Sequence, residues 1–377
     1  MSSTNRLSKS KIQETAVPVS QISQKSEMLA KKNPDGTITC LACARYCKIP
    51  EGQAGFCGVR ANDDRKLKLL VYGKPCAIWV DPVEKKPLFH FLPGSKSYSI
   101  GTFGCDFACD FCQNFDISQA PSEARVRDPK GWRDYFQRLI DKLEYVPPET
   151  IVSRAIESGC KSISFTYNEP TIFTEYALDI MKLGKKEGLR FIYVTNGYES
   201  RECWDALAPY LTAANIDLKA FNQNFYGKLC KANLEPVKES ILYVKKKYPK
   251  MWIEITTLLV PGWNDTENEL LDEAKWLAAI DAGMPWHVTA FHPDYKMQDS
   301  ESTKPETLMR AREIGRSVGL NYVYCGNLGF SYSNYETTVC PKCKKELIIR
   351  AGFTVTNNNV IDGKCRFCGE GIPGVWK

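Results

Sequence analysis

The sequence lacks the features of a membrane or secreted protein. No apolar run in its 377 residues approaches the ~20 residues that a membrane-spanning helix needs. The apolar group Met28-Leu29-Ala30 is far too short for the central region of a signal peptide. We therefore expect a cytoplasmic location and no membrane partner.

The sequence also lacks a strong charge of either sign. Its 50 basic and 44 acidic residues leave a formal net charge of +6, which long solvated lysine faces produce as readily as a nucleic-acid site does. The basic run 245–247 lies in a helical pattern and is interpreted as a solvated lysine face. No cluster combines basic with aromatic residues, as a nucleic-acid recognition surface would. A nucleic-acid partner is not favoured.

Cysteine, in contrast, is abundant, with 16 residues. Several are clustered in C-x2-C pairs, and in a large chain without an export signal this pattern indicates metal binding in a reducing compartment. Five others, which are scattered singly, are interpreted as small buried apolar residues: Cys76, Cys160, Cys203, Cys230 and Cys325.

Composition divides the chain into four segments. Residues 1–39 are polar and predict a disordered tail, and 40–80 predict a small four-cysteine metal module. Residues 81–330 alternate β-branched or aromatic runs with helical patterns, and 331–377 carry two further C-x2-C pairs.

The alternation within 81–330 predicts a parallel sheet and an α/β fold. Two helices are expected at 148–159 and 266–283. The strand-forming runs are 97–103, 162–168, 191–197, 213–220, 252–260, 286–292 and 321–327. Unusual residues follow these runs or lie at their ends, where a rolled sheet of βα units places its working residues.

Three cysteines follow the first run in the stretch GCDFACDFCQN. Cys105, Cys109 and Cys112 are spaced C-x3-C-x2-C, and no fourth cysteine is near. Three thiolates can hold three irons of a cubane iron–sulfur cluster and leave the fourth iron open to a small molecule. A zinc knuckle that borrows a distant ligand is the alternative that the spacing disfavours.

The motif CDFACDFC resembles the signature of radical S-adenosylmethionine (radical SAM) enzymes, with Phe111 as its aromatic residue. The resemblance implies a partial (βα)6-type barrel, a [4Fe–4S] cluster and SAM as cofactors, and reductive cleavage of SAM to a 5′-deoxyadenosyl radical that abstracts hydrogen from a substrate.

The whole chain from Cys40 to the C-terminus is similar to the radical SAM enzymes of the AmmeMemoRadiSam system, which are also described as pyruvate formate-lyase activating enzyme-like. The segments that carry this similarity are CLACARYCKIPEGQAGFCGVR, EKKPLFHFLPG, SIGTFGCDFACDFCQN, SFTYNEPTIF, VTNGY, NIDLKAF, VPGWND, FHPDYKM and YCGNLG. The chain departs from that family at Asp106, where Asn is usual. For the stretch 121–147, which also looks longer than usual, we expect a surface insertion without a role, and the alternatives are a cover over the site or a segment that binds a partner.

The superfamily resemblance also implies residues that bind SAM. Asn168 and Glu169 stand where the family has a Gly-Gly-Glu motif, so Glu169 should accept hydrogen bonds from the SAM ammonium group. The same likeness assigns the methionine or ribose end of SAM to four more residues, which are Thr195, Asp217, Lys219 and His292. An internal ion pair between Asp217 and Lys219, or a core role for His292, is the alternative reading. No catalytic residue is assigned.

Two further cysteine groups lie outside the predicted barrel. Cys40, Cys43, Cys47 and Cys57 are close enough in sequence to require a metal, and a structural zinc is slightly favoured over a second iron–sulfur cluster that could relay electrons. Cys340, Cys343, Cys365 and Cys368 have the pattern of a zinc ribbon, which we expect to fasten the C-terminus over the barrel.

The substrate stays open at this stage. A protein, as for glycyl-radical activases, competes with a small molecule or RNA, and a non-catalytic zinc-ribbon binding protein is the remote alternative. The resemblance implies a reductase such as ferredoxin or flavodoxin, and association with Memo-like and AMMECR-family proteins.

Overall fold

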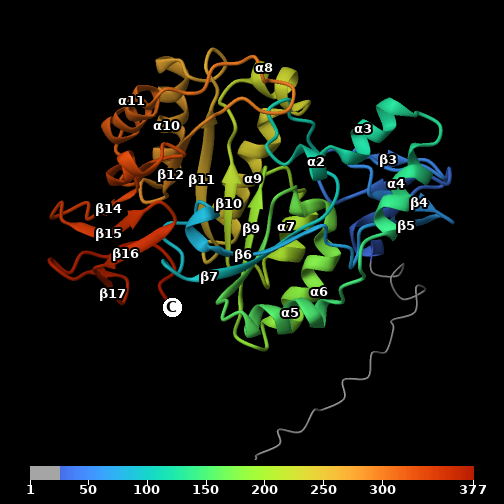
Figure 1. Ribbon diagram of the computed structural model, residues 1–377, viewed down its shortest axis with the longest axis horizontal. Helices are drawn as coiled ribbons and strands as arrows, with labels where there is room; N and C mark the ends of the chain where they lie inside the picture. The colour runs from blue at the N-terminus through green and yellow to red at the C-terminus, as the bar shows by residue number, and fades with distance from the viewer. Residues whose placement is uncertain (1–25) are drawn as a thin grey trace, which may run out of the picture.

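Seven parallel strands form the centre of the molecule (Figure 1). The computed structural model describes residues 26–377. The strands are β7 Lys96–Gly101, β8 Ser162–Phe165, β9 Arg190–Thr195, β10 Ala213–Asp217, β11 Trp252–Leu259, β12 Trp286–Ala290 and β13 Val323–Gly326. They pair in chain order, and every one overlaps a predicted run. The predicted α/β class and partial barrel are confirmed, and the parallel strands are the seven that the runs predict rather than the six of the (βα)6-type barrel that the resemblance implies.

An eighth strand, β6 Ala77–Pro82, pairs antiparallel with β7 and forms one edge of the sheet. β13 forms the other edge, so the barrel stays open. All residues of β8 and β12 are buried, as expected for a parallel sheet that is covered on both faces.

Helices connect the strands and cover the outside of the sheet (Figure 1). The larger ones are α5 Pro148–Glu157, α6 Thr174–Gly184, α7 Arg201–Leu207, α9 Leu234–Lys247, α10 Glu267–Asp281 and α11 Pro305–Ser317. Both helices predicted individually are confirmed: α5 begins at Pro148 and stops before Gly159, which has a positive φ of 67°, and Thr266 caps α10. None of the described helices is long and apolar enough to cross a bilayer.

The N-terminal module is larger than predicted. A 3-10 helix, Ser26–Leu29, precedes the three-stranded sheet of β1 Ala30–Lys32, β2 Ile38–Cys40 and β3 Lys48–Ile49. Leu29 and Ile38 are each 1% exposed, so residues 26–39 are part of a packed module and the tail prediction is wrong for them. The rest of the predicted tail, residues 1–25, lies outside the described residues. A hairpin of β4 Arg60–Asp63 and β5 Lys66–Leu69 completes the module.

Arg60 ties this module to the barrel. Its guanidinium donates to both carboxylate oxygens of Glu175 on α6 at 2.7 and 2.6 Å, and both side chains are 2% exposed. A paired, bidentate geometry is what a buried charge requires.

The stretch 121–147 contributes to α3 Ala120–Arg127 and α4 Trp132–Asp141, which lie beside the N-terminal module (Figure 1). Arg125 donates to the carbonyl oxygen of Gly55 at 3.1 Å, and Arg133 forms an ion pair with Asp63. The expected surface insertion without a role is therefore a cover for the cysteine module.

The C-terminal module consists of β14 Thr338–Val339, β15 Glu346–Ala351 and β16 Thr354–Asn358, followed by the short pair β17 Val360–Ile361 and β18 Lys364–Cys365. Arg350, 1% exposed, donates to the carbonyl oxygen of Phe89 at 2.7 Å. Tyr324 of β13 shares a 2.8 Å hydrogen bond with Thr338. The module is thus fastened to the barrel by buried polar contacts.

Candidate active site

The three predicted cluster ligands follow β7 and line one cavity of about 480 Å³. The loop turns at Gly104, whose φ is +95°. The backbone N–H of Phe107 donates to Cys105 Sγ at 3.3 Å, and Cys112 Sγ lies 3.1 Å from Ser118 Oγ. The loop therefore places all three thiols on the wall of one cavity.

These thiols are spread around the cavity. A compact metal site would bring three or more cysteine, histidine or carboxylate ligand atoms within 4.8 Å of one another. Among residues 26–377, only the C-terminal cysteines form such a group. Four bonds of about 2.3 Å to one tetrahedral zinc would place sulfurs roughly 3.8 Å apart. The wider spacing of Cys105, Cys109 and Cys112 fits ligands on different irons of a cluster.

Cys109 is buried and Cys105 and Cys112 are partly buried, and all three thiols hold their protons. Burial raises the pKa of Cys105, and it raises that of Cys112 to about 11. The adjacent Cys230 thiol, and then burial, raise the pKa of Cys109. Iron that binds here must therefore displace protons, as metal binding to thiols does in general.

Glu169 lies at the centre of a hydrogen-bonded group on the cavity wall. Its Oε1 accepts from the backbone N–H and hydroxyl of Thr171 at 2.9 and 2.7 Å and from Thr195 Oγ1 at 2.9 Å. Its Oε2 accepts from the backbone N–H of Asn196 at 2.8 Å. The structure thus joins Glu169 of the β8 end to Thr195 of the β9 end.

Two more carboxyl groups lie close to Glu169. Thr195 Oγ1 is 2.7 Å from Glu199 Oε1, and Asn196 donates to Asp106 Oδ1 at 2.7 Å. Burial, with the neighbouring carboxylates, raises the pKa of Glu169, and burial raises that of Glu199 to about 7. The Thr195 hydroxyl has a single proton but lies within hydrogen-bonding distance of both Glu169 and Glu199. If Thr195 donates that proton to Glu169, a protonated Glu199 can donate to the Thr195 oxygen, and both hydrogen bonds are then made. Sequence analysis missed Glu199.

The side chain of Asn168 is hydrogen-bonded to the loop that carries the three cysteines. Its Oδ1 accepts from the backbone N–H of Thr102 at 3.0 Å, and its Nδ2 donates to the carbonyl oxygen of Gly104 at 2.8 Å. The side chain predicted to bind SAM is therefore engaged with the loop that carries Cys105.

Asp217 and Lys219 also line this cavity. Lys219 Nζ and Asp217 Oδ2 form an ion pair of 2.8 Å, which was the alternative reading of these residues. The lysine Nζ is 5.9 Å from the ring centre of Phe111, which also lines the cavity and is 4% exposed.

His292 lies outside the cavity lining and is exposed. Its Nε2 is 2.8 Å from Nε2 of Gln113, the residue after Cys112. The structure places His292 at the rim, so a core role does not apply.

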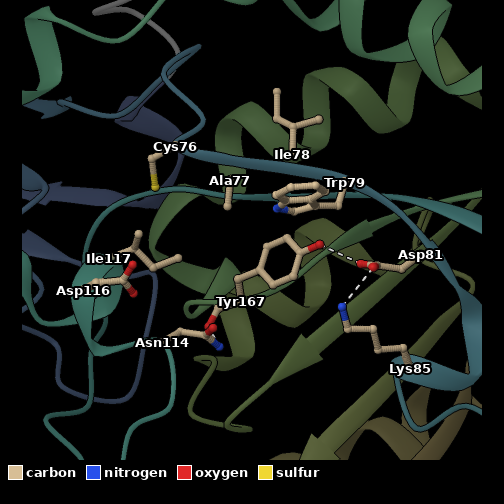
Figure 2. A pocket seen from close by; sticks show the side chains of 10 residues that line it. All are labelled: Cys76, Ala77, Ile78, Trp79, Asp81, Lys85, Asn114, Asp116, Ile117 and Tyr167. Atoms are coloured by element: carbon tan, nitrogen blue, oxygen red, sulfur yellow. Dashed lines mark hydrogen bonds and ion pairs between the residues drawn. The ribbon is translucent and has the colours of Figure 1, made fainter. Parts of the chain in front are cut away.

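A second cavity of about 650 Å³ adjoins the first (Figure 2). Lys85, Asn114 and Tyr167 line both. Tyr167 has a positive φ of 73°, and its hydroxyl donates to Asp81 Oδ2 at 2.6 Å. Sequence reasoning missed these residues, because their backbone geometry and pairing arise only when β6 lies beside β7.

The scattered cysteines divide into two kinds. Cys160, Cys203, Cys230 and Cys325 are buried, as predicted. Cys76 is partly exposed and lines the second cavity, so its prediction as a buried residue is wrong.

The C-terminal cysteines form a compact four-sulfur group. Cys340 and Cys368 are 3.6 Å apart at their sulfurs, and Cys343 and Cys365 are 3.7 Å apart. These separations match four thiolates around one tetrahedral ion, so this site could hold zinc. Phe353 of the same module lines the first cavity.

Comparison with known proteins agrees with this geometry. The sequence profile described as "Radical SAM superfamily" matches residues 99–274. An uncharacterized protein of Methanocaldococcus jannaschii is 39% identical over 350 residues, which are 92% of this chain and 98% of the relative. The chain belongs to the radical SAM superfamily. This membership implies a [4Fe–4S] cluster and SAM, and the three spread thiols beside a cavity fit both.

More distant relatives of this radical SAM protein are named as activating enzymes. A putative glycyl-radical enzyme activating enzyme of M. jannaschii is 24% identical, over 58% of this chain and 77% of the relative. The pyruvate formate-lyase 1-activating enzyme of Escherichia coli is 24% identical, over 57% and 87%. A solved radical SAM methyltransferase from Sphaerobacter thermophilus has a TM-score of 0.45 at 16% identity, over 62% of this chain and 67% of that structure.

Proposed function

We propose that this protein cleaves SAM reductively and uses the resulting radical to abstract hydrogen from a protein substrate. Cys105, Cys109 and Cys112 would hold a cluster with an open iron, which would supply the electron for cleavage of SAM to methionine and a 5′-deoxyadenosyl radical. The chain's own residues hold the cluster, orient SAM and exclude water from the cavity.

One observation carries the proposal. The three thiols, Glu169, Thr195 and the Asp217–Lys219 pair come from four neighbouring strand ends and line a single cavity. Carboxyl ends of parallel strands are where such folds place their reactive groups. The cavity of about 480 Å³ lies within the range of small-molecule sites.

The Glu169 carboxyl on the cavity wall suits a cationic ligand, and two further buried carboxyl groups lie close to it. Glu169, Glu199 and Asp106 are buried together, and burial raises the pKa of each. SAM carries an ammonium and a sulfonium group, and a nearby positive charge favours the ionised form of a carboxyl. Glu169 would then bind the ammonium group through a charge-assisted hydrogen bond.

The second cavity supports a polypeptide as the hydrogen donor. Its wall includes β6, with which no further strand pairs on its outer side among the described residues. Trp79 and Val80 on this strand are 67% and 43% exposed, so the edge offers both backbone groups and apolar side chains to an extended segment (Figure 2). Distant relatives named as activating enzymes favour the same class of substrate.

The reaction also needs an electron donor, for which a ferredoxin or flavodoxin in the cytoplasm is proposed. All sixteen cysteines are free thiols in the structure, in keeping with a reducing compartment. Memo-like and AMMECR-family proteins are proposed as functional associates on the similarity of the sequence motifs alone.

The test is anaerobic. The protein is reconstituted with iron and sulfide, reduced with dithionite and given SAM, and 5′-deoxyadenosine is measured together with the EPR signal of the cluster. We expect 5′-deoxyadenosine to form and the signal to change with SAM. The matched control replaces Cys105, Cys109 and Cys112 with Ala and should form none. A wild-type cluster that ignores SAM would exclude the proposed reaction.

A further inference from the structure

The N-terminal cysteine module touches both the loop that carries the cluster ligands and the segment that follows β9. The carbonyl oxygen of Cys57 lies 2.7 Å from the position that a Cβ on Gly104 would occupy, so nothing larger than glycine fits there. Cys43 forms a β-bridge with Glu199, and the backbone N–H of Ala44 donates to the Tyr198 carbonyl oxygen at 2.8 Å. The module therefore packs directly against the residues around Cys105.

Asp106 connects the two groups of cysteines. The Cys43 thiol is a near neighbour of its carboxylate. The Cys105 thiol lies 3.9 Å from Asp106 Oδ1. Arg45 donates to the main-chain oxygen of the same residue at 2.5 Å. One side chain thus separates a cysteine of the module from a ligand of the SAM-binding cluster.

The spacing of the sulfurs distinguishes the N-terminal cysteines from the zinc-type site. The C-terminal sulfurs gather within 4.8 Å, whereas those of Cys40, Cys43, Cys47 and Cys57 form no such group in the described chain. Cys105, Cys109 and Cys112 share that wider spacing. The N-terminal set, like the three cluster ligands, therefore lacks the compact spacing of the zinc-type site.

The surroundings suit an anionic, redox-active group. Arg45 lies over the ring of Phe56 at 3.6 Å, next to Cys57, and Arg125 donates to the carbonyl oxygen of Gly55. Cys40, Cys43 and Cys57 are buried, whereas Cys47 is partly exposed. The set is thus shielded on the side of the barrel and reaches the surface at one cysteine, where an external donor can approach.

We propose that Cys40, Cys43, Cys47 and Cys57 hold a second iron–sulfur cluster, which passes electrons to the cluster held by Cys105, Cys109 and Cys112. A reduced one-electron carrier protein gives one electron to the N-terminal cluster and is oxidised. The N-terminal cluster then gives that electron to the SAM-binding cluster and returns to its oxidised state. The transfer of electrons to the SAM-binding cluster rests on the proposed function. The binding of an iron–sulfur cluster by the four N-terminal cysteines does not.

Metal content tests the site. A triple variant in which Cys105, Cys109 and Cys112 are Ala is reconstituted anaerobically, and its iron, sulfide, zinc and reduced-state EPR spectrum are measured. We expect it to keep about half of the wild-type iron, with a cluster signal that SAM does not change. Zinc in place of this iron would overturn the proposal. Because the module's cysteines are intact in this variant, the result does not depend on whether substitutions within the module fold.

Matched double variants locate the iron. In the triple-variant background, Cys43→Ser with Cys57→Ser should remove the remaining iron, whereas Cys340→Ser with Cys343→Ser should leave it. Iron that survives the first pair, or is lost only with the second, would place the cluster elsewhere.

Reduction kinetics test the relay. Cys47→Ser changes the exposed cysteine, and freeze-quench EPR follows reduction of the SAM-binding cluster by reduced flavodoxin or by dithionite. We expect reduction by flavodoxin to slow at least tenfold and reduction by dithionite to stay within twofold. Equal flavodoxin rates in variant and wild type would overturn the relay. Wild-type SAM cleavage with dithionite tests the proposed function separately, so the two failures are distinguishable.

Discussion

In the structure Asp217 forms an ion pair with Lys219, and in the proposed complex it also contacts SAM. Its carboxylate pairs with Lys219 at 2.8 Å, and 32% of its side chain is exposed toward the cavity. We expect Asp217→Asn to weaken SAM binding roughly tenfold, because a hydrogen bond to a charged group contributes about 1.5–3 kcal/mol. Anaerobic calorimetry of the reconstituted protein measures this affinity.

Iron content is the control for Asp217→Asn and should match the wild type, since the residue is not a ligand. The companion Asp179→Asn changes a carboxylate on α6 that does not line the cavity, and its affinity should be unchanged. An unaltered affinity in Asp217→Asn would show that the residue serves the ion pair alone.

At the residue scale, the sequence predicted the chemistry of the site better than its contacts. The three thiols, Glu169 and Thr195 were predicted and lie together. The engagement of Asn168 with Gly104 was not predictable, because it depends on how the β8 end meets the loop after β7. Spacing along a chain indicates which ligands are available, and only packing shows what each side chain touches.

At the scale of elements, the turn between β7 and Cys105 depends on Gly104. Its φ of +95° disfavours any side chain, and a Cβ would meet the carbonyl oxygen of Cys57. We expect Gly104→Ala to lower the free energy of unfolding by more than about 3 kcal/mol, because backbone strain of about 1–2 kcal/mol adds to a steric clash. Anaerobic denaturant unfolding measures the change, and iron incorporation should also fall.

Gly262→Ala is the matched control for Gly104→Ala. Gly262 has a φ of +76°, but nothing lies within 4 Å of the position of its Cβ. The control should lose only the strain contribution, about 1–2 kcal/mol, and keep its iron. Equal losses in both variants would contradict the close packing of the module against the cluster loop.

The parallel strands were the elements most accessible to sequence analysis. Each apolar run predicted a strand, because both faces of a parallel sheet are buried. The antiparallel edge strand β6 and helix α3 were missed, since exposed residues such as Trp79 and polar stretches carry no comparable signal. Helix α4 was missed although Trp132, Phe136 and Ile140 recur at helical spacing.

At the scale of the whole molecule, the C-terminal module should depend on its metal. We expect Cys340→Ser with Cys365→Ser to remove one zinc per chain and to lower the thermal midpoint, because four thiolates replace a hydrophobic core in so small a unit. Elemental analysis and calorimetry measure both. Cys160→Ser, which changes a cysteine outside the metal groups, should keep its zinc, and an unchanged zinc content in the double variant would contradict the assigned site.

Acid should destabilise the protein through His90, which lies between the barrel and the C-terminal module. Its Nδ1 is 2.7 Å from the carbonyl oxygen of Pro373 and its Nε2 is 2.7 Å from Tyr324 Oη. Burial lowers the pKa of His90 from 6.5 to about 4. Between these pH values the unfolded chain binds more protons than the folded one, so stability falls as pH falls.

The contribution of His90 is about 3 kcal/mol across that pH window. Anaerobic unfolding of the wild type and of His90→Gln at pH 7 and pH 4.5 measures it. The wild type should lose more stability than the variant, and effects of acid on the metal sites cancel in the comparison. Parallel losses in the two proteins would contradict a neutral buried His90.

By itself the sequence determined the parallel α/β barrel, the three-cysteine site and the C-terminal four-cysteine site, because hydrophobic period and ligand spacing are local properties of a chain. Only the tertiary structure decided which groups meet. It placed Cys43 and Cys57 of the N-terminal module against the cluster loop, and it joined the edge strand β6 to the cavity through Tyr167. Such contacts join residues far apart in the chain, and their geometry follows from how the whole core packs.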